Sequence, residues 1–231
     1  MKKVALVGNP NVGKSVIFNA LTGGRQSVGN WPGTTVEKKE GVFKYKGMEF
    51  HVVDLPGIYS FAASSIDEKI ARDYILQERP DVVVNVVDAS NLERNLYLTM
   101  QLIEMEVTMV VALNKMDLAK SKGYKIDVKK LSKELGVPVI PMVAVKNKGI
   151  NELKEAIYYA AYYRIKTILR YNNEVERLIE IVKNKIIERK ILPDYPPRFV
   201  AIKLLENDKE FLKMANISKE IVKEWIMKNY K

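Results

Sequence analysis

Residues 8–15 read Gly-Asn-Pro-Asn-Val-Gly-Lys-Ser and match the pattern G-x-x-x-x-G-K-S. An apolar run precedes them at residues 4–7, and residues with helical spacing follow them to residue 22. Glycines let such a loop turn its backbone N–H groups toward phosphate oxygens, and the positive end of the helix dipole adds to the attraction. The stretch therefore predicts a phosphate-binding loop between a buried strand and a helix.

Two side chains of this loop have separate expected roles. Lys14 is expected to reach the β- and γ-phosphate oxygens, and the Ser15 hydroxyl is expected to bind Mg²⁺. The residues expected to contact the nucleotide here are Gly8, Asn9, Pro10, Asn11, Val12, Gly13, Lys14, Ser15 and Val16.

The chain up to about residue 165 alternates short apolar runs with helical stretches, which is typical of a mostly parallel sheet covered by helices. The expected strands are 3–7, 37–45, 48–54, 82–88, 108–114 and 137–141. The expected helices are 14–22, 65–78, 92–104, 128–135 and 150–168. The tight turn at Lys46-Gly47 predicts an antiparallel hairpin, so one of the six strands should run against the others.

After residue 170 the strand pattern stops, and apolar residues recur at helical spacing. All twelve glycines lie at or before Gly149, and helix interiors disfavour glycine. We therefore expect a small all-α part of three or four helices, interrupted by the prolines between 193 and 197. The expected domains are residues 1–165 and residues 166–231.

Composition excludes several classes of protein. The 231 residues contain no cysteine, which excludes disulfides, thiolate metal sites, iron–sulfur clusters and cysteine nucleophiles. The apolar runs are far shorter than the roughly 20 residues of a membrane helix, so the chain as given is expected to be soluble. The net charge is +10, and residues 1–165 (23 basic, 18 acidic) and 166–231 (15 basic, 10 acidic) share it equally. That even distribution is typical of an ordinary solvated surface.

Residues 114–117 read Asn-Lys-Met-Asp and follow an apolar run at the end of an expected strand. A carboxylate at Asp117 can accept two hydrogen bonds from the N1–H and N2–H₂ groups of guanine, a donor pair that adenine lacks. The stem of Lys115 can lie across the base plane. About 100 residues after a phosphate loop, Asn114, Lys115 and Asp117 predict guanine-nucleotide binding. The predicted fold is the α/β fold of P-loop GTPases, followed by a small all-α domain.

Two further segments have the composition of nucleotide switches. Asp54 ends an expected strand and is placed to hold a Mg²⁺-bound water, while the Gly57 N–H can sense the γ-phosphate. The loop at 29–37 is rich in glycine and threonine, and one of its two adjacent threonines is expected to bind Mg²⁺. The residues expected to contact the nucleotide here are Gly33, Thr34, Thr35, Asp54, Leu55, Pro56 and Gly57.

The sequence around these motifs resembles the N-terminal cytoplasmic region of the bacterial and archaeal ferrous iron transport protein B family. The resemblance is carried by residues 28–37, 54–60, 85–89 and 91–97. Residues 198–206 are similar to that family's helical domain, a spacer and guanine-nucleotide-dissociation-inhibitor domain between the GTPase and the membrane. The resemblance covers essentially the whole chain.

The resemblance implies a GTP-binding and slowly GTP-hydrolysing regulatory domain of a membrane Fe(II) transporter. It implies that the segment lies at the cytoplasmic face of the membrane, and that a multi-pass membrane part of the same polypeptide follows Lys231. It makes Thr35, rather than Thr34, the Mg²⁺ ligand beside Ser15 and, through water, Asp54. Nucleic acid is not an expected partner, and self-association into a homo-oligomer stays open.

Two positions, Ile58 and Asn11, bear on catalysis. Ile58 follows the D-x-x-G motif where many GTPases have glutamine, which implies slow hydrolysis or another way of placing water; Asp67 and Glu68 are interpreted instead as a solvated helix face. In related GTPases an asparagine at the position of Asn11 helps to hold K⁺. The residues expected to act in catalysis are Asn11, Lys14, Thr35 and Gly57.

The usual S-A-K loop that supports guanine is expected at Val143, Ala144 and Val145, by alignment on the Gly149-Ile150 pair. The Ala144 N–H can still reach the guanine O6 atom, but the serine hydroxyl and the lysine stem are missing. We therefore expect a looser hold on the base and faster nucleotide release.

Two other functions remain open at this point. One is a ribosome- or RNA-associated GTPase, which the positive charge suits. Against it, the helical part contains no glycine and so no G-x-x-G loop for RNA. The other is a GTP-binding module with negligible turnover, which Ile58 would favour.

Overall fold

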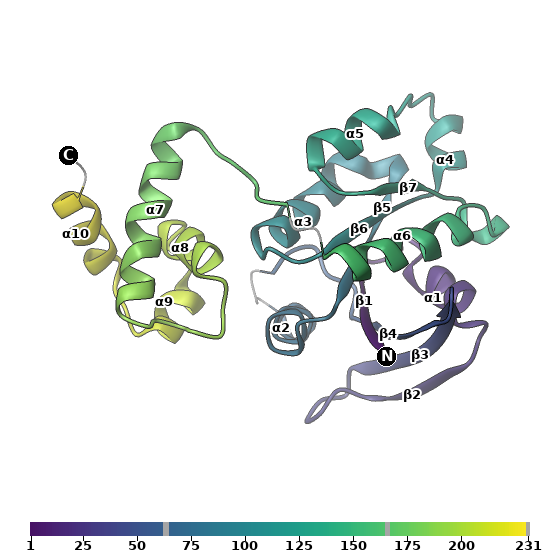
Figure 1. Ribbon diagram of the computed structural model, residues 1–231, viewed down its shortest axis with the longest axis horizontal. Helices are drawn as coiled ribbons and strands as arrows, with labels where there is room; N and C mark the ends of the chain where they lie inside the picture. The colour runs from purple at the N-terminus through teal and green to yellow at the C-terminus, as the bar shows by residue number, and fades with distance from the viewer. Residues whose placement is uncertain (62–64, 165–166, 230–231) are drawn as a thin grey trace. The chain divides into compact units, whose positions relative to one another are not determined.

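The structure is a computed structural model that describes residues 1–61, 65–164 and 167–229 (Figure 1). The chain divides into two compact units. The first contains Met1–Ile103 and Val107–Thr167, and the second contains Glu104–Glu106 and Ile168–Lys231.

Within the described residues, the first unit contains one seven-stranded sheet with the order β2-β3-β4-β1-β5-β6-β7. The strands are β1 (Lys2–Gly8), β2 (Gln26–Asn30), β3 (Glu37–Tyr45), β4 (Met48–Asp54), β5 (Val82–Asp88), β6 (Met109–Asn114) and β7 (Val139–Pro141). Strand β3 runs antiparallel to both β2 and β4, and all other neighbours are parallel. The predicted mostly parallel sheet with one antiparallel strand is therefore confirmed.

The seventh strand, β2, is the difference from the six that the sequence predicts. All of its residues are exposed, so its sequence has no apolar alternation to reveal it. It forms because its backbone pairs with β3, from Gln26 opposite Gly41 to Asn30 opposite Glu37. Part of the segment expected to be a mobile loop is therefore an edge strand.

Helices cover both faces of the sheet (Figure 1). They are α1 (Lys14–Thr22), α2 (Ile66–Asp73), α3 (Leu92–Glu104), α4 (Met116–Ser121), α5 (Val128–Leu135) and α6 (Ile150–Tyr163). Short turns of other helix types are η1 (Tyr74–Glu78), a π-helix that continues α2, and the 3₁₀ turns η2 (Ala89–Asn91) and η3 (Ala144–Lys146). Helix α4 was not predicted, and α6 ends five residues before the predicted end at Ile168, since Arg164 is left-handed. The intervening residues 165 and 166 lie outside the described ones.

The core of this unit lies on both sides of the central strands. Val4, Phe18, Phe50 and Leu153 are fully buried where α1 and α6 pack on one face. On the other face the Asn85 side chain of β5 donates to the Thr99 hydroxyl of α3 at 2.6 Å. Strands β1, β5 and β6 are thus covered on both faces, as the continuous apolar runs predict.

The described part of the second unit contains four helices, within the three or four predicted. They are α7 (Asn173–Glu188), α8 (Pro197–Leu205), α9 (Lys209–Ala215) and α10 (Lys219–Asn229). Phe199 and Phe211 meet edge to face in its core, at 5.4 Å between ring centroids. The guanidinium of Arg198 donates to Glu176 at 2.7 Å and to the Leu169 carbonyl at 2.7 Å. No helix in the described part of the chain is long and apolar enough to cross a membrane.

Candidate functional site

The phosphate loop connects β1 to α1 and depends on close backbone approaches. Gly13 has φ +93°, and a Cβ atom added there would lie 2.4 Å from the Asn114 Nδ2 atom. A Cβ atom at Gly8 would lie 2.5 Å from the Val86 carbonyl oxygen. Asn11 is also left-handed, with φ 65°. Both loop glycines are therefore required where the loop passes the ends of β5 and β6.

Asn114 joins the phosphate loop to the loop that follows β7. Its buried amide donates to the Val12 carbonyl oxygen at 2.9 Å and accepts from the Ala144 N–H at 3.0 Å. The two predicted loops, about 130 residues apart in sequence, are therefore held by one side chain.

The contacts of the predicted base loop differ from residue to residue. The Ala144 N–H, expected to reach the base, is used by Asn114, while the next residue, Val145, is 75% exposed. The Lys146 ammonium lies 3.0 Å from the Asp117 carboxylate. Lys146, one residue beyond the predicted base loop, therefore contacts the guanine-motif carboxylate, and the Ala144 N–H is occupied within the protein.

Lys115 connects the guanine motif to the phosphate loop and to β5. Its ammonium donates to the Asn11 carbonyl oxygen at 2.7 Å and to Asp88 Oδ2 at 2.7 Å. The other oxygen, Asp88 Oδ1, accepts from the N–H and the hydroxyl of Ser90, both at 2.8 Å. Burial opposes ionisation of Asp88, but the hydrogen bonds from Lys115 and Ser90 outweigh it and hold its pKa below the ordinary value.

Asp117 lies in the first turn of α4, and its side chain is exposed. One carboxylate oxygen accepts from the Leu118 N–H at 2.9 Å, and the other faces Lys146. The hydrogen bond from Lys146 lowers the pKa of Asp117, which favours the acceptor form that guanine recognition needs.

Asp88 and Lys146 lie outside the predicted motifs but contact Lys115 and Asp117. The parallel register places Asp88 of β5 directly opposite Asn114 of β6. The sequence does indicate Asp88 in one way: it is a polar residue at the end of a buried strand, and the neighbouring strand also ends on a polar residue. For Lys146, the signal was its place one residue after the predicted loop.

At the phosphate end, Lys14 and Asp54 form a buried ion pair that joins α1 to the end of β4. Burial raises the pKa of Asp54, and the charge of Lys14 opposes that rise. A Cβ atom at Gly57 would lie 3.3 Å from the backbone of Pro10, and the Ile58 N–H donates to the Gly8 carbonyl oxygen at 3.2 Å. The D-x-x-G segment therefore packs directly on the phosphate loop.

The donors present here suit Mg²⁺. They are the Ser15 hydroxyl, which is exposed on the first turn of α1, and the Asp54 carboxylate. Mg²⁺ prefers oxygen ligands and usually keeps several waters and phosphate oxygens rather than a complete protein cage. In keeping with that, the residues the structure describes hold no group of three or more His, Asp or Glu that could bind a metal.

Other residues of the loop are accessible or unpaired. Asn11, Ser15 and Val16 are exposed, whereas Asn9 is 4% exposed. Both polar atoms of the Asn9 amide lack a hydrogen-bond partner among the described residues.

Thr35, the third predicted Mg²⁺ ligand, is exposed in the turn between β2 and β3. The strand register places Lys39 opposite Asp54, and Thr35 precedes Lys39 by four residues. The Thr34 hydroxyl is used inside the turn, where it donates to the Trp31 carbonyl oxygen at 3.0 Å.

Several described residues after the D-x-x-G motif are buried or hydrogen-bonded. Ile58 is 2% exposed, and the Phe61 N–H donates to the Gln101 side chain at 2.9 Å. Glu68 is 8% exposed and accepts from the Ser60 hydroxyl at 3.0 Å, so its predicted place on a solvated helix face was wrong. A carboxylate at the start of α2 also suits the positive end of the helix, which the spacing alone did not reveal.

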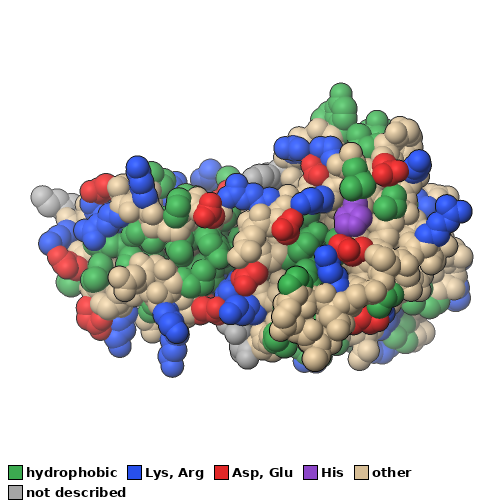
Figure 2. All heavy atoms as spheres, turned by 90° about the horizontal axis from the view of Figure 1, so that it is seen from below, with side chains coloured by type: hydrophobic (Ala, Val, Ile, Leu, Met, Phe, Trp, Pro, Cys, Tyr) green, Lys and Arg blue, Asp and Glu red, His purple; other side chains and the backbone are tan. Residues whose placement is uncertain are grey.

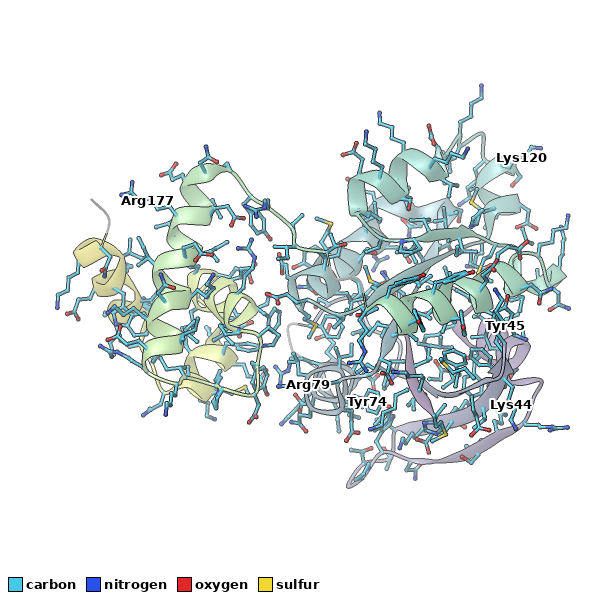
Figure 3. The ribbon with its side chains drawn as sticks, in the orientation of Figure 1. Lys44, Tyr45, Tyr74, Arg79, Lys120 and Arg177 are labelled. Carbon is cyan, nitrogen blue, oxygen red and sulfur yellow. The ribbon has the colours of Figure 1, made fainter. Side chains whose placement is uncertain are left out.

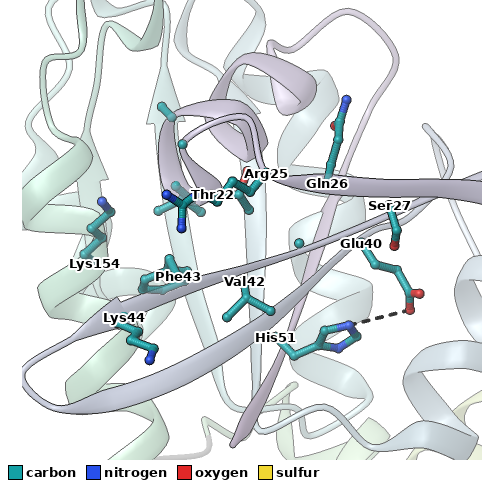
Figure 4. Close-up of a pocket in the computed structure, with 14 residues that line it drawn as sticks. Thr22, Arg25, Gln26, Ser27, Glu40, Val42, Phe43, Lys44, His51 and Lys154 are labelled. Carbon is teal, nitrogen blue, oxygen red and sulfur yellow. Dashed lines mark ion pairs between the residues drawn. The ribbon is translucent and has the colours of Figure 1, made fainter.

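The single histidine, His51 of β4, lines a hollow formed mainly by the end of α1, the start of β2 and β3 (Figure 4). Its Nε2 atom is 3.8 Å from the Glu40 carboxylate. Figure 2 shows it at the surface among side chains of both charges.

Both units of the chain match models of known protein families. Residues 2–157 match the family model described as "Ferrous iron transport protein B", and residues 171–228 match the model of the FeoB cytosolic helical domain. The chain is 55% identical over 222 residues to the Fe(2+) transporter FeoB of Methanocaldococcus jannaschii, which covers 95% of this chain and 33% of that protein. It is 44% identical over 218 residues to the Escherichia coli Fe(2+) transporter FeoB, which covers 90% of this chain and 27% of that one.

Solved structures are similar over both units. The crystal structure of the cytosolic domain of the T. maritima FeoB iron transporter in a GDP form superposes with a TM-score of 0.87 and 45% identity, covering 99% of this chain and 94% of that one. A point mutant of S. thermophilus NFeoB bound to GDP gives a TM-score of 0.88 and 40% identity, covering 98% of this chain and 88% of that one. The chain thus spans about a third or less of the two transporters above, and nearly all of these two solved structures.

Proposed function

The chain belongs to the ferrous iron transport protein B family, and from that premise we propose that it is the GTP-binding, slowly GTP-hydrolysing regulatory domain of a membrane Fe(II) transporter. The observation that carries this proposal is the Asn114 side chain, which bonds the phosphate loop on one side and the base loop on the other. That bridge supports one site with a guanine end and a phosphate end.

At the guanine end, the carboxylate of Asp117 would accept from the base, and Lys115 would lie along the base plane. Lys115 is already fixed in place by Asn11 and Asp88. The exposed Val145 would offer its N–H to the guanine O6 atom, because the Ala144 N–H is used by Asn114. The hold on the base is then closer to that of other GTPases than the sequence suggests.

At the phosphate end, Lys14 would exchange its contact with Asp54 for the β- and γ-phosphate oxygens. The residues that would hold Mg²⁺ are Ser15, Thr35 and, through water, Asp54. When bound, Mg²⁺ neutralises charge that develops on the phosphates. Gly57 packs against Pro10 of the phosphate loop, so its N–H would suit a sensor of the γ-phosphate.

We expect hydrolysis to be slow because Ile58 is buried and cannot orient a water molecule. The Asn11 side chain is exposed at the loop while its carbonyl is fixed by Lys115, so its amide oxygen is accessible to help hold K⁺. A K⁺ ion there would stabilise negative charge in the transition state.

A multiple-turnover assay of phosphate release from GTP and Mg²⁺ tests these points. We expect slow release that is faster in KCl than in NaCl, with the difference lost in Asn11→Ala and with ATP as an inactive control. Binding of GTP without any release would favour the binding-module alternative. Equal rates in the two salts would remove the K⁺ part of the proposal and leave the rest.

The proposal extends to the whole protein through the relatives, which are about three times as long as this chain or longer. Residues 1–165 would form the GTPase domain and residues 166–231 the helical spacer that passes the nucleotide state to a membrane part. The segment would then lie at the cytoplasmic face of the membrane. Several apolar stretches of about 20 residues after Lys231 in the encoded protein would support this, and a stop codon there would contradict it.

A further inference from the structure

Trp31 connects the two segments that are expected to respond to the γ-phosphate. Its ring meets the ring of Tyr74 edge to face, with 5.5 Å between centroids and an interplanar angle of 76°. Trp31 begins the turn that contains Thr35, whereas Tyr74 begins the π-helix η1 that continues α2, beyond the D-x-x-G motif. Figure 3 labels Tyr74 beside the α2 ribbon. One aromatic contact therefore joins the first switch to the second.

The Trp31 ring is also contacted by a lysine of β3. The Lys38 ammonium lies 5.1 Å from the centroid of the Trp31 ring, and it forms an ion pair with Glu40 at 2.8 Å. A cation over an indole ring is attracted by the electron density of the ring face. The Trp31 ring is 8% exposed as a result.

The turn is closed on Trp31, so Thr35 cannot move without it. The Trp31 N–H donates to the Val36 carbonyl oxygen at 2.9 Å, and the Trp31 carbonyl oxygen accepts from the Thr34 N–H at 3.0 Å. The Thr34 hydroxyl accepts in turn from the Val36 N–H at 3.2 Å. Residues 31–36 are therefore one hydrogen-bonded body, anchored by the Trp31 ring.

The anchor is also easily released. The Trp31 Nε1 atom is buried and has no hydrogen-bond partner among the described residues. When the ring leaves Tyr74, the apolar contact is lost, but this donor gains water. Such a contact is strong enough to bias a position and weak enough to be reversed.

We propose that Trp31 and Tyr74 are positioning residues that hold Thr35 away from the Mg²⁺ ligands Ser15 and Asp54, and so lower the affinity for GTP relative to GDP. The inference rests on the proposed function. The ring contact fixes the hydrogen-bonded turn that carries Thr35 against Tyr74. In this proposal Thr35 reaches the metal only when the turn leaves Tyr74. GTP binding must break the Trp31–Tyr74 contact because GTP needs Thr35, whereas GDP binding leaves the contact intact. The free energy of the contact therefore weakens the binding of GTP and not that of GDP.

The test compares the dissociation constants of a non-hydrolysable GTP analogue and of GDP, both with Mg²⁺, in the wild type and in Tyr74→Ala. An aromatic pair of this kind corresponds to a roughly 2- to 13-fold change in affinity. We expect the ratio of the analogue constant to the GDP constant to fall by that factor in Tyr74→Ala. Tyr74→Phe keeps the ring and should leave the ratio unchanged.

Two further variants separate positioning from general structural damage. In a Thr35→Ala background the turn no longer carries a hydroxyl that can bind Mg²⁺. Adding Tyr74→Ala should then leave the ratio of the two dissociation constants unchanged. In a Trp225→Phe background Trp31 is the remaining tryptophan, and its emission should shift to the red with the GTP analogue and not with GDP. This readout does not depend on any substitution at Tyr74.

The outcomes are distinct. An unchanged ratio in folded Tyr74→Ala, or equal loss of affinity for both nucleotides, would overturn the positioning role, as would an emission shift equal for both. If the wild type binds neither guanine nucleotide, the proposed function itself fails, and the positioning role fails with it.

Discussion

Replacing Asp88 with asparagine should release the guanine nucleotide faster, although Asp88 is not one of the sequence motif residues. Its Oδ2 atom accepts from the Lys115 ammonium at 2.7 Å, and Lys115 also holds the Asn11 carbonyl oxygen. Asparagine keeps the shape and one acceptor for Ser90 but removes the charge. Lys115 then loses the partner that keeps it in place for the base.

The magnitude follows from burial. A hydrogen bond to a charged group contributes about 1.5–3 kcal/mol, but the side chain of Lys115 is 31% exposed and that of Asp88 is 13% exposed. Solvent screening lowers the expected loss to roughly 1–2 kcal/mol. If that loss falls on the bound state, GDP dissociates about 5- to 30-fold faster.

The assay is stopped-flow displacement of a fluorescent GDP analogue, with Asp81→Asn as a matched control. Asp81 precedes the opposite end of β5 and is likewise paired, with Lys2 at 2.9 Å. Asp81→Asn should lower the free energy of unfolding and leave the dissociation rate unchanged. An unchanged rate in Asp88→Asn, or equal acceleration in both variants, would refute the reasoning.

Four other predictions concern the same unit. Asn114→Ala leaves the Val12 carbonyl and the Ala144 N–H unpaired, so urea unfolding should show a loss of about 2–6 kcal/mol, at roughly 1–3 kcal/mol for each buried group. Gly13→Ala places a Cβ atom 2.4 Å from Asn114 Nδ2 at a φ of +93°, and calorimetry should show nucleotide binding abolished in a chain destabilised by at least about 1–2 kcal/mol. Val145→Pro removes the N–H proposed for guanine O6 and should speed GDP release about 2- to 13-fold, whereas Val145→Ala, which keeps the N–H, should not. Burial raises the pKa of Tyr74 to about 12, and the charges of Glu78 and Glu40 add to the rise. The pKa of tyrosine in the unfolded chain is about 10, so the folded state favours the neutral phenol. The contribution of neutral Tyr74 to the free energy of unfolding is therefore complete below pH 10 and is lost as the pH rises toward 12. Alkaline unfolding followed by circular dichroism should therefore begin at higher pH in Tyr74→Phe.

Sequence patterns predicted the elements that carry strong periodicity. The predicted ranges 37–45, 48–54 and 82–88 coincide with β3, β4 and β5, and 92–104 coincides with α3. Buried strands and amphipathic helices show their burial directly in the spacing of apolar residues. Strand β2 and helix α4 have no such signal, because β2 is exposed and α4 is only six residues long.

The sequence by itself determined the chemistry of the site. The phosphate loop, the guanine motif and the D-x-x-G segment are each continuous in the chain, and each requires particular residue types at fixed spacing. Their functional groups could therefore be assigned before their positions were known, as could the family.

Only the tertiary structure decided which groups meet. Asn114 accepts from the Ala144 N–H, Asp88 fixes Lys115, and Trp31 packs on Tyr74. These contacts join residues that are 27 to 43 positions apart in the chain. They arise from the register of parallel strand ends and from the pairing of an exposed edge strand, neither of which leaves a local pattern in the sequence.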